Sequence, residues 1–105
     1  MTTDRIQRFE ALVASDPQNP LHRFALAGAY LGAGDWALAE AAYGRCLALD
    51  PGWMMAYVRR GRCLIELSRW DDARAMLERG AELATAQGHD EPFAEIRDLM
   101  AQLPD

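Results

Sequence analysis

The side chains that could do chemistry in this sequence are few and widely spaced. All eleven basic residues are arginine, so no lysine is present for a Schiff base, for a pyridoxal phosphate linkage or for a phosphate-binding loop. The two serines, Ser15 and Ser68, fall near expected helix boundaries and outside any G-x-S-x-G turn. Because no nucleophile is paired with a base, the sequence predicts that the protein is not an enzyme.

Metal-binding and cofactor-binding patterns are missing as well. Cys46 and Cys63 match neither a C-x-x-C motif nor a zinc knuckle. Each lies in an apolar helical pattern, which is typical of a small core residue in a reducing compartment. His22 and His89 are far apart and lack metal-ligand spacing. We therefore expect no metal and no cofactor.

The charge balance and the apolar runs limit the possible partners and location. A formal net charge of −5 argues against a nucleic-acid partner, since phosphate-backbone binding needs a basic face. The longest uncharged run, Phe24–Gly34, is too short and too rich in glycine to span a bilayer. The opening residues, MTTDRIQRFE, lack the apolar run of a signal peptide. We expect a cytoplasmic protein without a membrane partner, and the exclusive use of arginine favours a GC-rich bacterial genome.

The elements that must position these side chains are all predicted to be helices. Helical spacing of apolar residues and N-cap signals such as Asn19-Pro20 and Asp35 place four helices at about 3–15, 20–31, 36–49 and 53–67. A fifth is expected to start at Ser68, which resembles a capping box with Asp71, and to fade near residue 85. A last amphipathic helix is predicted from the apolar residues Phe93, Ile96, Leu99, Met100 and Leu103.

Two predicted helices have similar sequences. Residues 36–49 read WALAEAAYGRCLAL and residues 70–83 read WDDARAMLERGAEL, with Trp36 and Trp70 in register at a spacing of 34. The helix-ending prolines Pro17 and Pro51 have the same spacing. A period of this length with two helices per unit indicates helical hairpins that stack to bury a shared core. The predicted fold class is an all-α solenoid of antiparallel hairpins with about six helices.

The residues at the repeated positions resemble those of tetratricopeptide repeat proteins. The matching residues are Leu26, Ala27, Tyr30, Ala39, Tyr43 and Pro51 in the first unit and Tyr57, Gly61, Leu64, Ala73 and Leu77 in the second. The chain departs from the family pattern at Arg23, Arg60 and Thr85. The resemblance implies one domain over residues 1–105, with an N-terminal capping helix (1–17), two repeats (18–51 and 52–85) and a C-terminal capping helix (86–105). In both repeats large aromatics, here Trp36 and Trp70, are expected in the packing.

The resemblance implies a protein-binding scaffold whose first helices line a concave groove. Helical angles at about 100° per residue place one strip of side chains on this face. Its first half is Leu21, Ala25, Gly28 and Gly32, and its second half is Met55, Arg59, Arg62 and Glu66. Small residues allow close backbone approach, and arginines hold carboxylates by paired hydrogen bonds. A plain solvated face, with Arg62 paired to Glu66, is the alternative.

The predicted function is that of an adaptor that binds a peptide or helical segment of a partner with acidic and apolar residues. A chaperone that sequesters an apolar segment of a client is one alternative. A structural subunit that forms homo-oligomers through the apolar part of the strip is another. The basic and amide-rich clamp by which many family members hold peptide C-termini is not expected here, since lysine is absent and Asn19 is the one asparagine.

Overall fold

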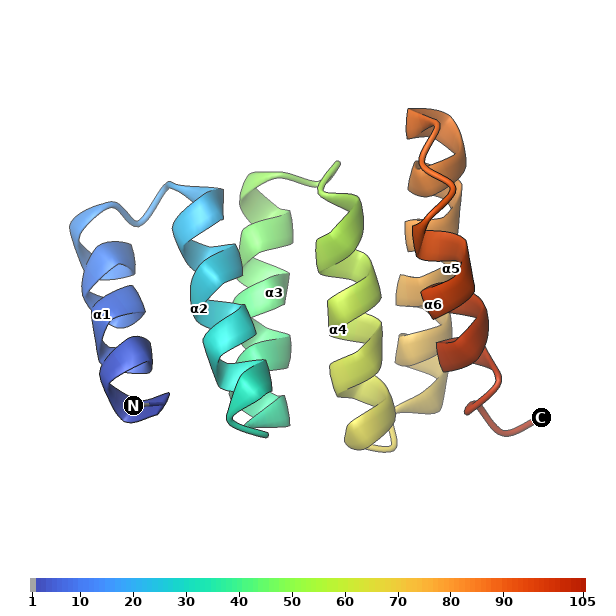
Figure 1. Cartoon of the computed structure of the whole chain (residues 1–105), viewed down its shortest axis with the longest axis horizontal. Helices are drawn as coiled ribbons and strands as arrows, with labels where there is room; N and C mark the ends of the chain where they lie inside the picture. Colours follow the sequence, from blue (N-terminus) through green and yellow to red (C-terminus); the bar gives the residue numbers. More distant parts are fainter. Residues whose placement is uncertain (1) are drawn as a thin grey trace. The chain divides into compact units, whose positions relative to one another are not determined.

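The computed structural model describes residues 2–105, and their regular structure is entirely helical (Figure 1). The helices are α1 (Thr2–Ser15), α2 (Pro20–Gly32), α3 (Trp36–Leu49), α4 (Met54–Glu66), α5 (Trp70–Gln87) and α6 (Pro92–Met100). Within these residues no helix is both long and apolar enough to cross a bilayer. The all-α repeat fold predicted from the sequence is therefore confirmed.

Local sequence signals set most helix ends. The Asn19 side chain accepts a hydrogen bond from the Leu21 amide at 3.0 Å, and Pro20 takes the first helical position of α2. Asp35 accepts from the Leu38 amide at the start of α3. The capping box predicted at Ser68 is wrong: α5 begins one residue after Arg69, with no side-chain cap, and Ser68 has a φ of 59°. Ser68 instead lies in the turn between α4 and α5, where its left-handed backbone conformation helps to reverse the chain.

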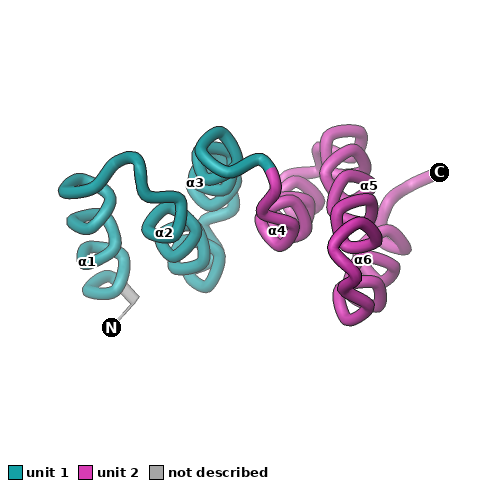
Figure 2. Tube along the Cα trace, turned by 90° about the horizontal axis from the view of Figure 1, so that it is seen from above, with its two compact units in different colours: residues 1–51 teal, residues 52–105 magenta. Residues whose placement is uncertain are grey.

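The chain divides into two compact units, residues 1–51 and 52–105, which Figure 2 shows in different colours. In the first unit, α2 packs against both α1 and α3. Ala27 and Ala39 are fully buried there, and Tyr43 is the largest buried side chain. The ring of Tyr43 meets the ring of Phe24 edge to face, with the centroids 5.6 Å apart. Small residues on α2 and α3 therefore leave room for one aromatic pair.

In the second unit, α4 packs along α5, and α6 packs on α5 and touches α4. Gly61 packs closely against Leu77: a Cβ at Gly61 would lie 2.8 Å from Leu77 Cδ2 and 3.5 Å from the Ala73 carbonyl oxygen. Leu77 and Ala73 are fully buried. Ala39 and Ala73, two small residues at matched repeat positions, are thus both buried. Only glycine fits at position 61 without displacing Leu77.

The last helix contributes to the core as the amphipathic pattern predicted, with one exception. Ile96, Leu99 and Leu103 are buried in the same cluster as Leu64 and Leu77. Phe93, expected in this contact, is 37% exposed, because it lies in the first turn of α6. Trp70, expected in the packing, is also on the surface, since it opens α5 where the helix emerges from its turn.

Candidate functional site

The first half of the predicted strip forms an open surface on α2, which we call the α2 face (Leu21, Ala25, Gly28 and Gly32). Leu21 is 59% exposed, the highest value among the large apolar side chains of the described residues. A Cβ at Gly28 would meet only the Tyr43 hydroxyl, at 3.9 Å, and one at Gly32 would meet nothing within 4 Å. Tertiary packing in this unit therefore does not require glycine at either position, and the face has room for another backbone.

The second half of the strip lies on α4, and we call it the α4 face (Met55, Arg59, Arg62 and Glu66). Met55 and Arg59 are half-buried, whereas Arg62 and Glu66 are exposed. The Arg59 Nε atom is buried and lies 3.7 Å from Glu95 Oε1 of α6. At that distance the two groups attract as an ion pair without forming a good hydrogen bond. The structure thus joins Glu95, which the sequence did not single out, to this face.

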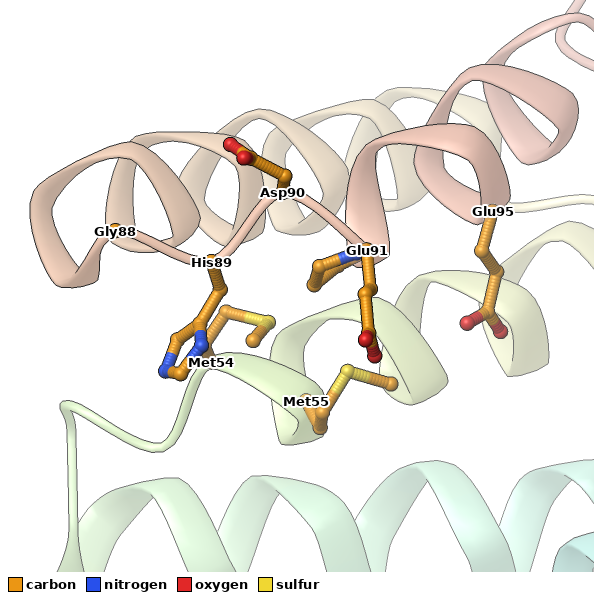
Figure 3. A pocket seen from close by; sticks show the side chains of 8 residues that line it. Met54, Met55, Gly88, His89, Asp90, Glu91 and Glu95 are labelled. Atoms are coloured by element: carbon orange, nitrogen blue, oxygen red, sulfur yellow. The ribbon is translucent and has the colours of Figure 1, made fainter.

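A hollow of about 670 Å³ opens beside the first turn of α4 (Figure 3). It is lined by Met54, Met55, Gly88, His89, Asp90, Glu91, Pro92 and Glu95. Met55 is the one member that the sequence had placed at a binding surface. In Figure 3 the Glu91 and Glu95 side chains point toward α4, while the Asp90 carboxylate points away from the methionines. We call this feature the methionine hollow.

The connection between α5 and α6 is held in place by hydrogen bonds. Gly88 ends α5 with a φ of 72°, and the His89 amide donates to the Ala84 carbonyl at 2.9 Å. The Gln87 side chain donates to the Gly52 carbonyl at 3.0 Å, which ties the end of α5 to the start of α4. Glycine after a helix is a signal that sequence can supply, but the contact with Gly52 is not.

No sequence motif predicted the methionine hollow. Its lining comes from two segments, residues 54–55 and 88–95, that are more than thirty positions apart. The turn GHDEP reads as an ordinary helix connection, and the acidic residues within it look like a solvated surface. Among residues 2–105, no three His, Cys, Asp or Glu side chains are grouped so that they could hold a metal ion.

Tyr30 and Cys46 of the first unit have raised pKa values. Burial, together with a 2.7 Å hydrogen bond to Glu10 and the charges of Glu10 and Asp35, raises the pKa of Tyr30 to about 12. Burial, with a smaller effect of Asp50, raises the pKa of Cys46 to about 11. A buried thiol that resists ionisation is a poor nucleophile. This agrees with the prediction that Cys46 is a core residue.

Two tetratricopeptide repeat family models match the sequence, one over residues 30–103 and the other over residues 6–52. The chain belongs to the tetratricopeptide repeat family. The first match spans both of the repeated helices, 36–49 and 70–83.

A curated relative is similar to part of the chain. It is the tetratricopeptide repeat and J domain-containing co-chaperone DNJ1 of Fusarium oxysporum, which is 32% identical over 74 residues. The match covers 70% of this chain, and this chain spans 14% of the length of that relative.

Solved tetratricopeptide repeat domains share the fold. The TPR2B domain of yeast Sti1, in complex with an Hsp70 peptide, superposes with a TM-score of 0.89 at 16% identity, covering 96% of this chain and 81% of that one. The first domain of Spaghetti (RPAP3), bound to the HSP90 peptide SRMEEVD, has a TM-score of 0.79 at 28% identity. That match covers 91% of this chain and 75% of the other.

Proposed function

We propose that this tetratricopeptide repeat protein is a non-enzymatic adaptor that binds a peptide segment of a partner protein. The observation that carries the proposal is the open α2 face. Leu21 offers exposed apolar surface, and Gly28 and Gly32 have free space at their Cβ positions. Such a face lets a bound backbone approach closely, and the family's solved domains with peptides supply the precedent.

The α4 face offers a second, polar surface on the other unit, and we propose that it also contacts the partner. Arg62 is exposed, and Arg59 is half-exposed and already balanced by Glu95. We propose that the exposed Arg62 contacts an acidic residue of the partner, while Arg59 is positioned by its ion pair with Glu95. Arginine suits this role because its planar fork binds a carboxylate through two parallel hydrogen bonds.

The test begins with co-purification and mass spectrometry and continues with calorimetric titration of the identified partner segment. Gly28→Leu should block the α2 face, and Arg62→Ala should remove a charge-assisted contact. A desolvated contact of this kind contributes about 1.5–3 kcal/mol. Ala37→Leu on α3 and Arg97→Ala on α6 are matched controls, since both residues are exposed and lie outside the two faces.

Two results would separate the outcomes. Weaker binding by both test variants, with native affinity in both controls, would support the proposal. Native affinity in folded Gly28→Leu and Arg62→Ala would exclude these faces and move the binding surface elsewhere on the molecule.

A chaperone role is a second candidate, because Leu21 and the small residues of the α2 face could also shield an apolar stretch of a client. The similarity of the co-chaperone DNJ1 to this chain over 74 residues also favours this candidate. The two roles differ in the state of the partner. A chaperone should co-purify with one unfolded client, whereas an adaptor should bind a folded protein through an accessible segment. Light scattering identifies homo-oligomers, the remaining alternative.

A further inference from the structure

We propose that the methionine hollow binds an arginine or lysine side chain of a partner segment, together with an apolar residue next to it. This inference rests on the proposed peptide-binding function and specifies the chemistry of one part of the ligand. It differs from the sequence-based expectation, which pointed to acidic and apolar residues. The occupant we infer is an extended segment of another protein.

The floor of the hollow is apolar. Met54 is buried and Met55 half-buried at the first turn of α4, and Pro92 is buried at the start of α6. Methionine side chains are flexible and polarisable, so they adapt to apolar groups of different shapes. A floor of this kind favours an aliphatic side chain and the methylene stem of an arginine or lysine.

The rim of the hollow carries negative charge. In Figure 3 Glu91 points toward Met55 and Glu95 points toward α4, and Asp90 lies between them and His89 in the chain. Arg59 offsets part of the Glu95 charge at 3.7 Å. Within the described chain, no hydrogen bond or ion pair engages the side chains of Asp90 and Glu91. A cationic group placed above the methionines would therefore meet one unbalanced carboxylate directed at it, Glu91.

The shape and the rigidity of the hollow fit a bound side chain. Its volume of about 670 Å³ lies within the 300–1,000 Å³ range common for ligand sites. The hydrogen bonds of Gln87 to Gly52 and of His89 to Ala84 already fix the lining turn. Binding then costs less conformational entropy, because the site does not have to be ordered first.

The overall charge favours another protein over a second copy of this chain. The chain carries a net charge of −5, so two copies repel each other while a basic segment is attracted. Light scattering distinguishes the partner segment from an arginine of a second copy.

The experiment uses the full chain and a fluorescein-labelled peptide of sequence Ser-Gly-Leu-Arg-Leu-Gly-Ser, followed by fluorescence anisotropy. Three matched peptides replace the arginine with citrulline, the arginine with glutamate, or both leucines with serine. Citrulline keeps the shape of arginine without its charge. We expect the arginine peptide to bind about threefold to tenfold more tightly than the citrulline peptide at low salt. The difference should shrink as salt is added.

Protein variants then locate the binding. Glu91→Gln should weaken binding of the arginine peptide while leaving the citrulline peptide unaffected. Met55→Gln should weaken both, since it removes apolar surface without a large change in length. Glu78→Gln, an exposed carboxylate of α5 outside the hollow, is the control for charge alone. Circular dichroism checks that each variant is folded.

Several outcomes would overturn the inference. Equal affinity for the arginine and citrulline peptides would exclude recognition of charge, and equal effects of Glu91→Gln and Glu78→Gln would exclude the hollow. Stronger binding of the glutamate peptide would reverse the ligand chemistry while leaving the adaptor function intact. Dimers in light scattering that Glu91→Gln dissolves would replace the partner segment with a second copy. The adaptor function fails separately, if Gly28→Leu and Arg62→Ala leave binding of the purified partner unchanged.

Discussion

Equivalent positions of the two helical hairpins hold different pairs of large and small side chains. In the first unit, Phe24 on α2 packs against Tyr43 on α3. The positions 34 residues later are Val58 and Leu77, and Leu77 packs against Gly61. Smaller core side chains in the second unit are matched by smaller partners, Gly61 for Ala27 and Gly80 for Cys46.

On the exposed faces the second unit, not the first, has the larger side chains. On α2 the strip holds Gly28 and Gly32, where on α4 it holds Arg62 and Glu66. At these aligned positions the first unit thus has an aromatic pair inside and glycines outside, and the second unit has aliphatic side chains inside and charged residues outside. One backbone register can therefore present two different binding chemistries, because packing constrains only the inward positions.

The largest expected difference between the units concerns their terminal helices. Truncation after Gly88 removes Ile96, Leu99 and Leu103 from the core of the second unit. Each buried side chain of this size stabilises a fold by about 1.5–3 kcal/mol, so the loss rivals the whole stability of a small domain. We expect fragment 1–88 to aggregate or to bind a hydrophobic dye strongly, as measured by dye fluorescence and light scattering.

Removal of α1 is the matched comparison. No residue from 3 to 15 is fully buried, so a fragment that starts at Pro17 should lose less stability than fragment 1–88. A monomeric fragment 1–88 that unfolds cooperatively at the native midpoint would contradict the role given to α6.

The next effect concerns the core pair of the second unit. Leu77→Ala should lower the free energy of unfolding by about 2–5 kcal/mol, because Leu77 is fully buried and leaves a cavity. Leu38→Ala is the control, since Leu38 is 47% exposed. Chemical denaturation measures both. A loss of similar size in the two variants would show that Leu77 is not a core contact.

A smaller difference in stability is expected when Gly61 of the second unit and Gly28 of the first unit are replaced by alanine. Gly61→Ala should cost about 1–3 kcal/mol by overpacking against Leu77, reduced by about 1 kcal/mol of improved helix propensity. Gly28→Ala should be neutral or stabilising, because its nearest contact is 3.9 Å away. A double-mutant cycle sharpens the test: Gly61→Ala should become stabilising once Leu77 is alanine. Equal effects of Gly61→Ala in both backgrounds would mean that the two residues do not interact.

The smallest effect is expected at alkaline pH, and it arises in the first unit. The pKa of Tyr30 is about 12 and that of Cys46 about 11 in the folded protein, above the usual values near 10 and 8.5. Folding therefore favours the protonated forms. Their stabilising effect is complete below about pH 8.5 and is lost as the pH rises toward 12. No lysine titrates in this range, so tyrosine and cysteine are the side chains that change charge there.

Denaturation at a series of alkaline pH values should show this decline, and Tyr30→Phe combined with Cys46→Ala should make it shallower. Tyr30→Phe also removes the 2.7 Å hydrogen bond to Glu10, a cost that is independent of pH below the tyrosine pKa. An unchanged slope in the double variant would show that other groups cause the decline.

The sequence by itself determined the helices, their order and the register of the repeat. These depend on short-range signals: apolar spacing, the caps Asn19 and Asp35, and the recurrence of Trp36 at Trp70. The burial of Ala39, Ala73 and Gly61 followed from the same register. Local signals gave wrong predictions at Ser68, Trp70 and Phe93. All three lie at or near a helix end, where the turn and the surrounding packing determine the helix boundary and the exposure of side chains.

Only the tertiary structure decided what surrounds the α4 face. The ion pair of Arg59 with Glu95 and the methionine hollow both join residues of α4 to residues more than thirty positions away. No periodic pattern encodes such contacts, since they depend on where α6 docks on the hairpin. The position of α6 is determined by the burial of Ile96, Leu99 and Leu103 in the core. As a consequence, polar residues of α6 such as Glu95 lie beside α4.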